Sequence, residues 1–202
     1  MPEYMIHKSF FKKNPLEKFS AAAFADFHLT MLDQDELNAE MENIVFKYKP
    51  DDERRAQLEQ DRNIIEAMDS GEAIVKYMRQ EHEGLADPMF CKKALAMQDG
   101  AAPLILRRYM TTGQDRFIEL AFLILAKANI RYVEQLYADY ANIRNPYAQS
   151  MACLLFGERE MQNAASLLME EYERFKREYP DESYNQGPLL ALHILYGEAT
   201  AK

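Results

Sequence analysis

A helical pattern repeats along the second half of this 202-residue chain. Each unit has a very apolar first segment, a tight turn containing Gly or Asn, and a second segment with one apolar stripe at helical spacing. The second segments begin at Ala101, Ile130 and Met161, in steps of 29 and 31 residues. A single helix pair cannot bury apolar faces on both of its sides, whereas stacked pairs can. The repeat therefore predicts an α-solenoid.

Helical segments are expected through the rest of the chain as well. The chain has only 7 Gly and 8 Pro, too few for the frequent turns of a β-sandwich or barrel. We predict an all-α fold, an α-α superhelix of helical hairpins preceded by an N-terminal helical region. Residues 1–86 are expected to hold a leading arm and about four helices, and residues 87–202 the repeats, packed as one continuous domain. The helices expected in the repeat region span residues 88–98, 101–111, 115–128, 130–143, 146–156, 159–178 and 187–198, with Gly100 and Gly157 among the predicted stops.

The turns of the repeat carry a family resemblance. The segments ALAMQDG (94–100), LILAKAN (123–129) and CLLFGER (153–159) align, and prolines stand near three first-helix starts, at positions 88, 146 and 188. Over about residues 87–198 the chain resembles short bacterial HEAT-like repeats. That resemblance implies a superhelix whose second helices line a concave, partner-binding side.

Two other helical architectures stay open. The repeat period is shorter than the ~40–47 residues usual in HEAT repeats. Ala152, Ala164 and Leu168 indicate a tetratricopeptide-like array, although their small-residue pattern does not recur in the other units. An irregular helical bundle is the third alternative.

Charge restricts the class of partner. The chain has 24 basic and 33 acidic side chains, a net charge of −9. Nucleic-acid binding normally needs a basic stripe that displaces counterions from phosphates, and the sequence shows no such stripe. We therefore expect no nucleic-acid partner and set aside the DNA-glycosylase activity of some HEAT-like folds. An acidic surface suits a protein with a basic partner.

Sequence motifs for catalysis, metals and cofactors are missing. The chain has no His-Glu-x-x-His, no Cys-x-x-Cys, no Gly-rich phosphate loop and no Gly-x-Ser-x-Gly elbow. Cys91 and Cys153 lie in apolar helical patterns and are expected to be buried thiols. We predict no catalytic residue, no metal and no cofactor, and hence a protein that is not an enzyme.

Membrane and export signals are also missing from the sequence. The opening residues MPEYMIHKSFFKK contain no apolar signal-peptide core. The longest apolar run, Leu120 to Ala126, is far shorter than the ~20 residues of a membrane span. We expect a cytoplasmic protein in which this run lies in a helix covered on all sides.

The expected function is protein or peptide binding on the concave face of a short solenoid. Arg and Tyr are common at binding hot spots because they combine contact area with polar groups. The alternatives are an acidic inhibitor or immunity-type protein that masks a basic partner, and an enzyme with an unrecognised site. The candidate binding residues lie on the second segments of the repeat: Arg107, Arg108, Arg131, Tyr132, Gln135, Asp139 and Gln162.

Overall fold

The computed structural model describes residues 52–80 and 86–196, and across these ranges the regular structure is helical, with no β-strand. The predicted all-α class is confirmed. The leading arm and the helices expected between residues 14 and 49 lie outside the described residues.

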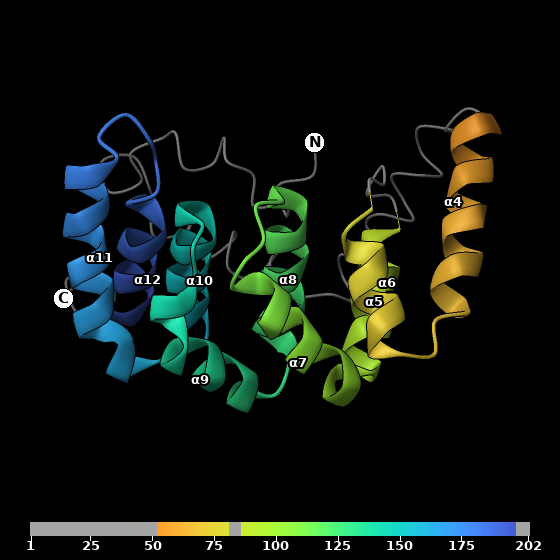
Figure 1. Ribbon diagram of the computed structural model, residues 1–202, viewed down its shortest axis with the longest axis horizontal. Helices are drawn as coiled ribbons and strands as arrows, with labels where there is room; N and C mark the ends of the chain where they lie inside the picture. The colour runs from red at the N-terminus through yellow and green to blue at the C-terminus, as the bar shows by residue number, and fades with distance from the viewer. Residues whose placement is uncertain (1–51, 81–85, 197–202) are drawn as a thin grey trace.

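Consecutive α-helices with short connections make up the described part of the chain (Figure 1). Two short 3-10 helices, η2 (Tyr140–Asn142) and η3 (Gln162–Ala164), interrupt the sequence of α-helices. The α-helices are α4 (Asp52–Glu66), α5 (Gly71–Met78), α6 (Asp87–Ala96), α7 (Gln98–Tyr109), α8 (Asp115–Lys127), α9 (Ile130–Ala138), α10 (Pro146–Glu158), α11 (Ala165–Glu178) and α12 (Gln186–Tyr196).

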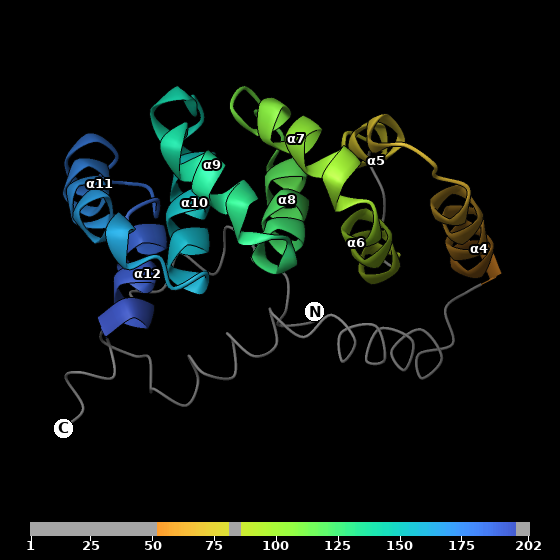
Figure 2. The ribbon, with the colours of Figure 1, turned by 90° about the horizontal axis from the view of Figure 1, so that it is seen from below.

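The helices form two rows, and the chain alternates between them (Figure 2). One row holds α4, α6, α8, α10 and α12, which we call the first helices, and the other holds α5, α7, α9 and α11, the second helices. Each first helix contacts the next one in its row, and the contact of α10 with α12 is the most extensive between any two described elements. Since α4 and α5 join the same rows, the stack begins before residue 87.

Both rows bow in the view of Figure 2, and the second helices lie on the outer side of the bow. The first helices are the more closely packed row, as expected for the inner side of a bent stack. The expectation that the second helices line a concave side is therefore wrong for this stack. Residues on α7 and α9 face outward, where a partner would meet a convex surface.

The centre of the stack is α8, which contacts α5, α6, α7 and α10. All seven residues from Leu120 to Ala126 are buried, as the sequence predicts. Neighbours on several sides explain why this helix has almost no polar face over that run. Helix α10 is similar: every residue from Ser150 to Glu158 is buried between α8 and α12.

Two glycines allow helices to touch backbone to backbone. A Cβ atom at Gly71, the first residue of α5, would overlap the carbonyl oxygen of Gly100 in α7. At Gly157 in α10, a Cβ atom would lie 2.5 Å from the Cα of Ala191 in α12. Both contacts exclude any larger side chain, because the opposing atoms belong to backbone that cannot rotate away.

These contacts overturn two predicted helix ends. Gly100 lies inside the first turn of α7, and Gly157 lies inside α10, which continues to Glu158. The chain reverses instead at Glu160, whose φ of 53° is left-handed. At position 157 glycine supplies space between helices, which a sequence pattern cannot distinguish from a helix stop.

Two predicted helices are also divided. The segment expected at 130–143 forms α9 and then η2, and the segment expected at 159–178 forms η3 and then α11. The start predicted at Asn145-Pro146 is confirmed: the Asn145 side chain accepts hydrogen bonds from the backbone N–H groups of Tyr147 (2.8 Å) and Ala148 (3.2 Å).

Candidate functional site

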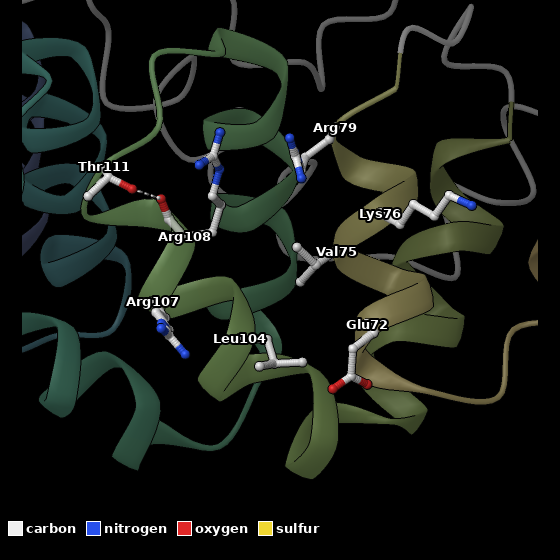
Figure 3. A pocket seen from close by; sticks show the side chains of 8 residues that line it. All are labelled: Glu72, Val75, Lys76, Arg79, Leu104, Arg107, Arg108 and Thr111. Atoms are coloured by element: carbon white, nitrogen blue, oxygen red, sulfur yellow. Dashed lines mark hydrogen bonds between the residues drawn. The ribbon is translucent and has the colours of Figure 1, made fainter.

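A groove of about 340 Å³ runs between α5 and α7 on the row of second helices (Figure 3). One wall comes from α5 and the residue after it, and the other from α7 and its C-terminal extension. We call this feature the α5–α7 groove. It is lined by Glu72, Val75, Lys76, Arg79, Leu104, Arg107, Arg108 and Thr111.

The groove is shaped by where its two helices touch. The Gly71–Gly100 contact joins α5 and α7 near their N-terminal ends. Beyond it the helices diverge, so that Glu72 lies at the narrow end and Arg79 and Arg108 lie at the wide end (Figure 3). Glycine at position 71 allows this close approach at the narrow end, and the C-terminal halves of the two helices line an open groove.

Positive charge dominates the groove lining. Lys76, Arg79, Arg107 and Arg108 line the groove together with a single carboxylate, Glu72. No side chain of these four cations forms an ion pair or hydrogen bond with another described residue. These four neighbouring cations, which have no carboxylate partner in the described ranges, form a locally positive surface on a chain of net charge −9. Such a surface attracts anionic groups.

Part of this charge complements the helices themselves. Lys76 lies in the last turn of α5, and Arg107 and Arg108 lie in the last turn of α7. Cations there are stabilised by the partial negative charge of the helix C-terminus, by about 0.3–1 kcal/mol each. The helix ends account for the presence of cations, but they leave the outer guanidinium donors available to a ligand.

Arg108 is held differently from the other cations. Its side chain is half-buried, and its Nε atom is buried without an acceptor among the described residues. Packing rather than an internal ion pair therefore fixes this side chain. In Figure 3 the guanidinium groups of Arg108 and Arg79 lie at the same end of the groove. A side chain fixed before binding loses less conformational entropy when a ligand arrives.

The predicted binding residues divide into several places. Arg107 and Arg108 lie together in the groove, whereas Arg131 and Tyr132 begin α9. The Tyr132 hydroxyl donates to Asp99 (2.7 Å), and an Arg131 guanidinium nitrogen contacts both Asp99 (2.5 Å) and the Tyr132 hydroxyl (2.6 Å). The expectation of a solvent-facing Tyr132 is wrong, because only 4% of the residue is exposed. Its ring packs in the core while its hydroxyl reaches the surface.

The remaining predicted residues lie along the outer row beyond the groove. Gln135 on α9 and Gln162 on η3 are exposed, and no other described residue hydrogen-bonds to either side chain. Asp139 is half-buried at the C-terminal end of α9. These three residues line the same row as the groove but are not part of it.

Sequence reasoning missed Lys76 and Arg79. A signal was present: Arg107 follows Lys76 by 31 residues and Arg108 follows Arg79 by 29, the steps seen between later repeat units. Gly100 likewise follows Gly71 by 29 residues. Starting the repeat at residue 87 concealed this correspondence. The 29-residue step relates Arg79 to Arg108 in the same register as Gly71 and Gly100, and these two arginines lie at the same end of the groove (Figure 3).

Buried polar groups elsewhere hold the fold together. The Tyr140 hydroxyl donates to Glu171 (2.7 Å), Glu171 accepts from Arg174 Nε (3.0 Å), and Arg174 also donates to Gln149 (2.8 Å). These bonds join η2, α10 and α11, and each buried polar atom gains a partner that offsets its loss of water.

Both cysteines are buried free thiols, as the sequence predicts. Burial raises the pKa of Cys91 and of Cys153 well above the usual range. The reactive thiolate is therefore disfavoured at either position.

A carboxyl group at the α8–α10 contact titrates near neutrality. Burial raises the pKa of Glu119 to about 7, although the hydrogen bond that Glu119 accepts from the Tyr147 hydroxyl (3.1 Å) acts to lower this pKa. Because the folded state favours the protonated form, this group stabilises the fold fully below about pH 4.5, its unfolded pKa, and less as the pH rises through about 7.

The variant Glu119→Gln should remove that pH dependence, because its amide stays neutral and its oxygen can still accept from Tyr147. Relative to the variant, the wild type should lose about 1–2 kcal/mol of unfolding free energy between about pH 4.5 and pH 8. Urea unfolding of both proteins at several pH values measures this difference. Parallel stability curves for the two proteins would contradict a raised pKa.

Two structural tests concern metals and membranes. Within residues 52–80 and 86–196, no cluster of three or more His, Cys, Asp or Glu side chains is placed to hold a metal ion. In the same ranges, the helices are all too short or too polar to cross a membrane.

Comparison with known proteins adds no family assignment. No family model, curated protein or solved structure matches this chain significantly. The HEAT-like resemblance therefore stays a prediction, and the function must be argued from the helices and the groove themselves.

Proposed function

We propose that this chain is a non-enzymatic binding module for a protein or peptide, and that its contact surface is the outer row of second helices. The observation that carries the proposal is a set of side chains on this row that form no hydrogen bond or ion pair with another described residue. Gln135 and Gln162 are exposed, and neither side chain has a hydrogen-bond partner in the described chain. The four cations of the α5–α7 groove form no ion pair with a described carboxylate.

Stacked helix pairs suit this function physically. Each pair contacts only its neighbours, so the outer side chains can vary without loss of the core. Side chains from adjacent second helices form one extended surface, and Arg is among the residues most enriched at binding hot spots. Exposed Met169 on α11, at 53%, adds an adaptable apolar contact to the same row.

Local charge favours an acidic partner segment over the basic partner suggested by net charge alone. The groove has four cations among its eight lining residues, whereas the net charge of −9 belongs to the chain as a whole. An inhibitor that masks a basic surface would need a carboxylate-rich contact face, and the groove has one carboxylate among its eight lining residues.

A capture experiment with paired variants tests the proposed surface. The full chain, immobilised, is exposed to lysate of the source cells, and retained proteins are identified by mass spectrometry. The double variant Gln135→Arg with Gln162→Arg changes the outer row outside the groove. We expect it to lose the partner that the wild type retains, with its thermal unfolding little changed because both residues are exposed.

The matched control places the same arginines on first helices. Asn63 on α4 and Ala96 on α6 are exposed, and the double variant Asn63→Arg with Ala96→Arg should retain the partner. Loss of the partner from this control alone would place the contact on the first helices and overturn the proposed surface.

A further inference from the structure

We infer that the α5–α7 groove binds an acidic segment of the partner, in which Asp or Glu residues flank an apolar residue. This inference rests on the proposed function and deepens it by naming the chemistry that the partner presents. Carboxylates would contact Arg79 and Arg108 at the wide end, and the apolar side chain would lie against Val75 and Leu104.

The cations favour a carboxylate for geometric reasons. Three of the four are arginines, whose planar guanidinium groups donate two parallel hydrogen bonds to a carboxylate. Their outer nitrogens do not compete with an internal carboxylate, because no described residue pairs with them. The Thr111 hydroxyl at the wide end donates to the Arg108 carbonyl oxygen (3.5 Å), so the guanidinium groups are the donors offered to a carboxylate.

A phosphate group fits the groove less well than a carboxylate. Phosphate sites commonly use the N-terminal ends of helices, where free backbone N–H groups point at the anion. The wide end of this groove lies at the C-terminal ends of α5 and α7, where backbone carbonyl groups carry partial negative charge. A doubly charged phosphate would be repelled more strongly there than a singly charged carboxylate.

A nucleic-acid strand is disfavoured by the extent of the charge. The cations are confined to one groove of about 340 Å³, whereas the chain as a whole carries a net charge of −9. A phosphodiester backbone would leave this patch within a few nucleotides and would then meet an acidic surface.

The groove also has an apolar floor and two unlike ends. Val75 and Leu104 are half-buried on opposite walls; Leu104 lies near Glu72, and Val75 lies between Glu72 and Arg79 (Figure 3). When an apolar side chain of the segment covers their exposed area, that area is removed from water, which favours binding. Glu72 at the narrow end repels a carboxylate, so the acidic residues of the segment should point to the wide end. The groove therefore selects both the composition and the direction of the segment.

The test uses fluorescence anisotropy with the full chain and a synthetic probe. The probe is a fluorescein-labelled peptide of repeated Glu-Glu-Leu triplets, and its neutral counterpart has Gln-Gln-Leu triplets. We expect the acidic probe to bind at least about tenfold more tightly than the neutral one, and its affinity to fall steeply with added salt. Equal binding of the two peptides, or no binding of the acidic peptide, would overturn the inference.

Variants locate the binding on the groove. Arg79 is exposed, and Arg79→Glu should weaken binding of the acidic probe at least about tenfold without altering the helical circular dichroism. Arg108→Gln, which keeps most of the side-chain volume, should act in the same direction. An unchanged affinity in both variants would show that the probe binds elsewhere.

Lys127→Glu is the matched control, with the same reversal of charge. Lys127 ends α8, and the Asn129 N–H just beyond it donates to Gln98 at the start of α7 (2.8 Å). Arg108 follows Gln98 by ten residues of α7, a rise of about 15 Å, so Lys127 lies far from the arginines at the wide end of the groove. Its variant should bind the acidic probe within about twofold of the wild type.

Competition distinguishes the two anions. Inorganic phosphate should displace the acidic probe no better than chloride at equal ionic strength. Displacement at much lower phosphate concentration would assign the groove to phosphate and overturn the carboxylate inference. None of these results depends on Gln135 or Gln162, so failure of the groove inference can be distinguished from failure of the proposed function.

Discussion

Replacing Gly157 with alanine is expected to destabilise the protein by about 2–3 kcal/mol. The added Cβ atom would lie 2.5 Å from the Ala191 Cα atom and 2.7 Å from its Cβ atom. Neither atom can rotate away, so α10 and α12 must separate along the most extensive helix contact of the described chain. Thermal or urea unfolding of the variant measures the loss.

Gly100→Ala is the matched control for this effect. A Cβ atom there meets nothing within 4 Å, although Gly100 also lies inside a helix. Alanine has the higher helix propensity, so this variant should be more stable than the wild type, by up to about 1 kcal/mol. Equal effects at the two glycines would mean that the close contact of α10 with α12 is incorrect.

Replacing Leu125 with aspartate is expected to abolish cooperative folding. Leu125 is fully buried in α8, the helix in contact with both rows. An unpaired carboxylate at this position costs about 4–5 kcal/mol or more, comparable with the whole stability of many domains. Circular dichroism and a thermal melt of the purified variant should show no cooperative transition.

Lys127→Asp is the control for this prediction. It tests whether the loss of folding comes from burying the carboxylate or from placing an aspartate anywhere in α8. Lys127 is exposed at the end of the same helix. Aspartate there meets only the unfavourable charge of the helix C-terminus, a cost of about 0.3–1 kcal/mol. A cooperative melt of Leu125→Asp near the wild-type temperature would contradict the central position of α8.

Much of the fold could be predicted because hydrophobic burial leaves a strong signal in sequence. The run from Leu120 to Ala126 lacks a polar face, and only a helix covered by neighbours on several sides can accept it. The cap and proline at Asn145-Pro146 likewise carry a local preference that the tertiary structure does not change.

Other features depend on contacts that sequence patterns do not encode. Gly100 and Gly157 both resemble helix stops, yet both lie inside helices, and only the packing of α12 against α10 shows that glycine is required at Gly157. Tyr132 follows the exposed Arg131 in α9, yet its ring is buried while its hydroxyl reaches Asp99. The direction of the bow depends on small differences in helix spacing summed over the whole stack.

Only one wall of the candidate site could be predicted from the sequence. Arg107 and Arg108 were predicted as binding residues, but their partners across the groove, Lys76 and Arg79, belong to a helix outside the predicted repeat region. A groove requires two walls, and the second wall becomes visible only when α5 is aligned with α7.

Hydrogen exchange of the full chain, measured by mass spectrometry with and without its captured partner, tests whether the partner contacts the outer row of second helices. We expect slower exchange on binding in the C-terminal halves of α5 and α7 and along α9, with exchange in the first helices unchanged. Slower exchange confined to α6, α8 and α10 would contradict it and move the binding surface to the inner row.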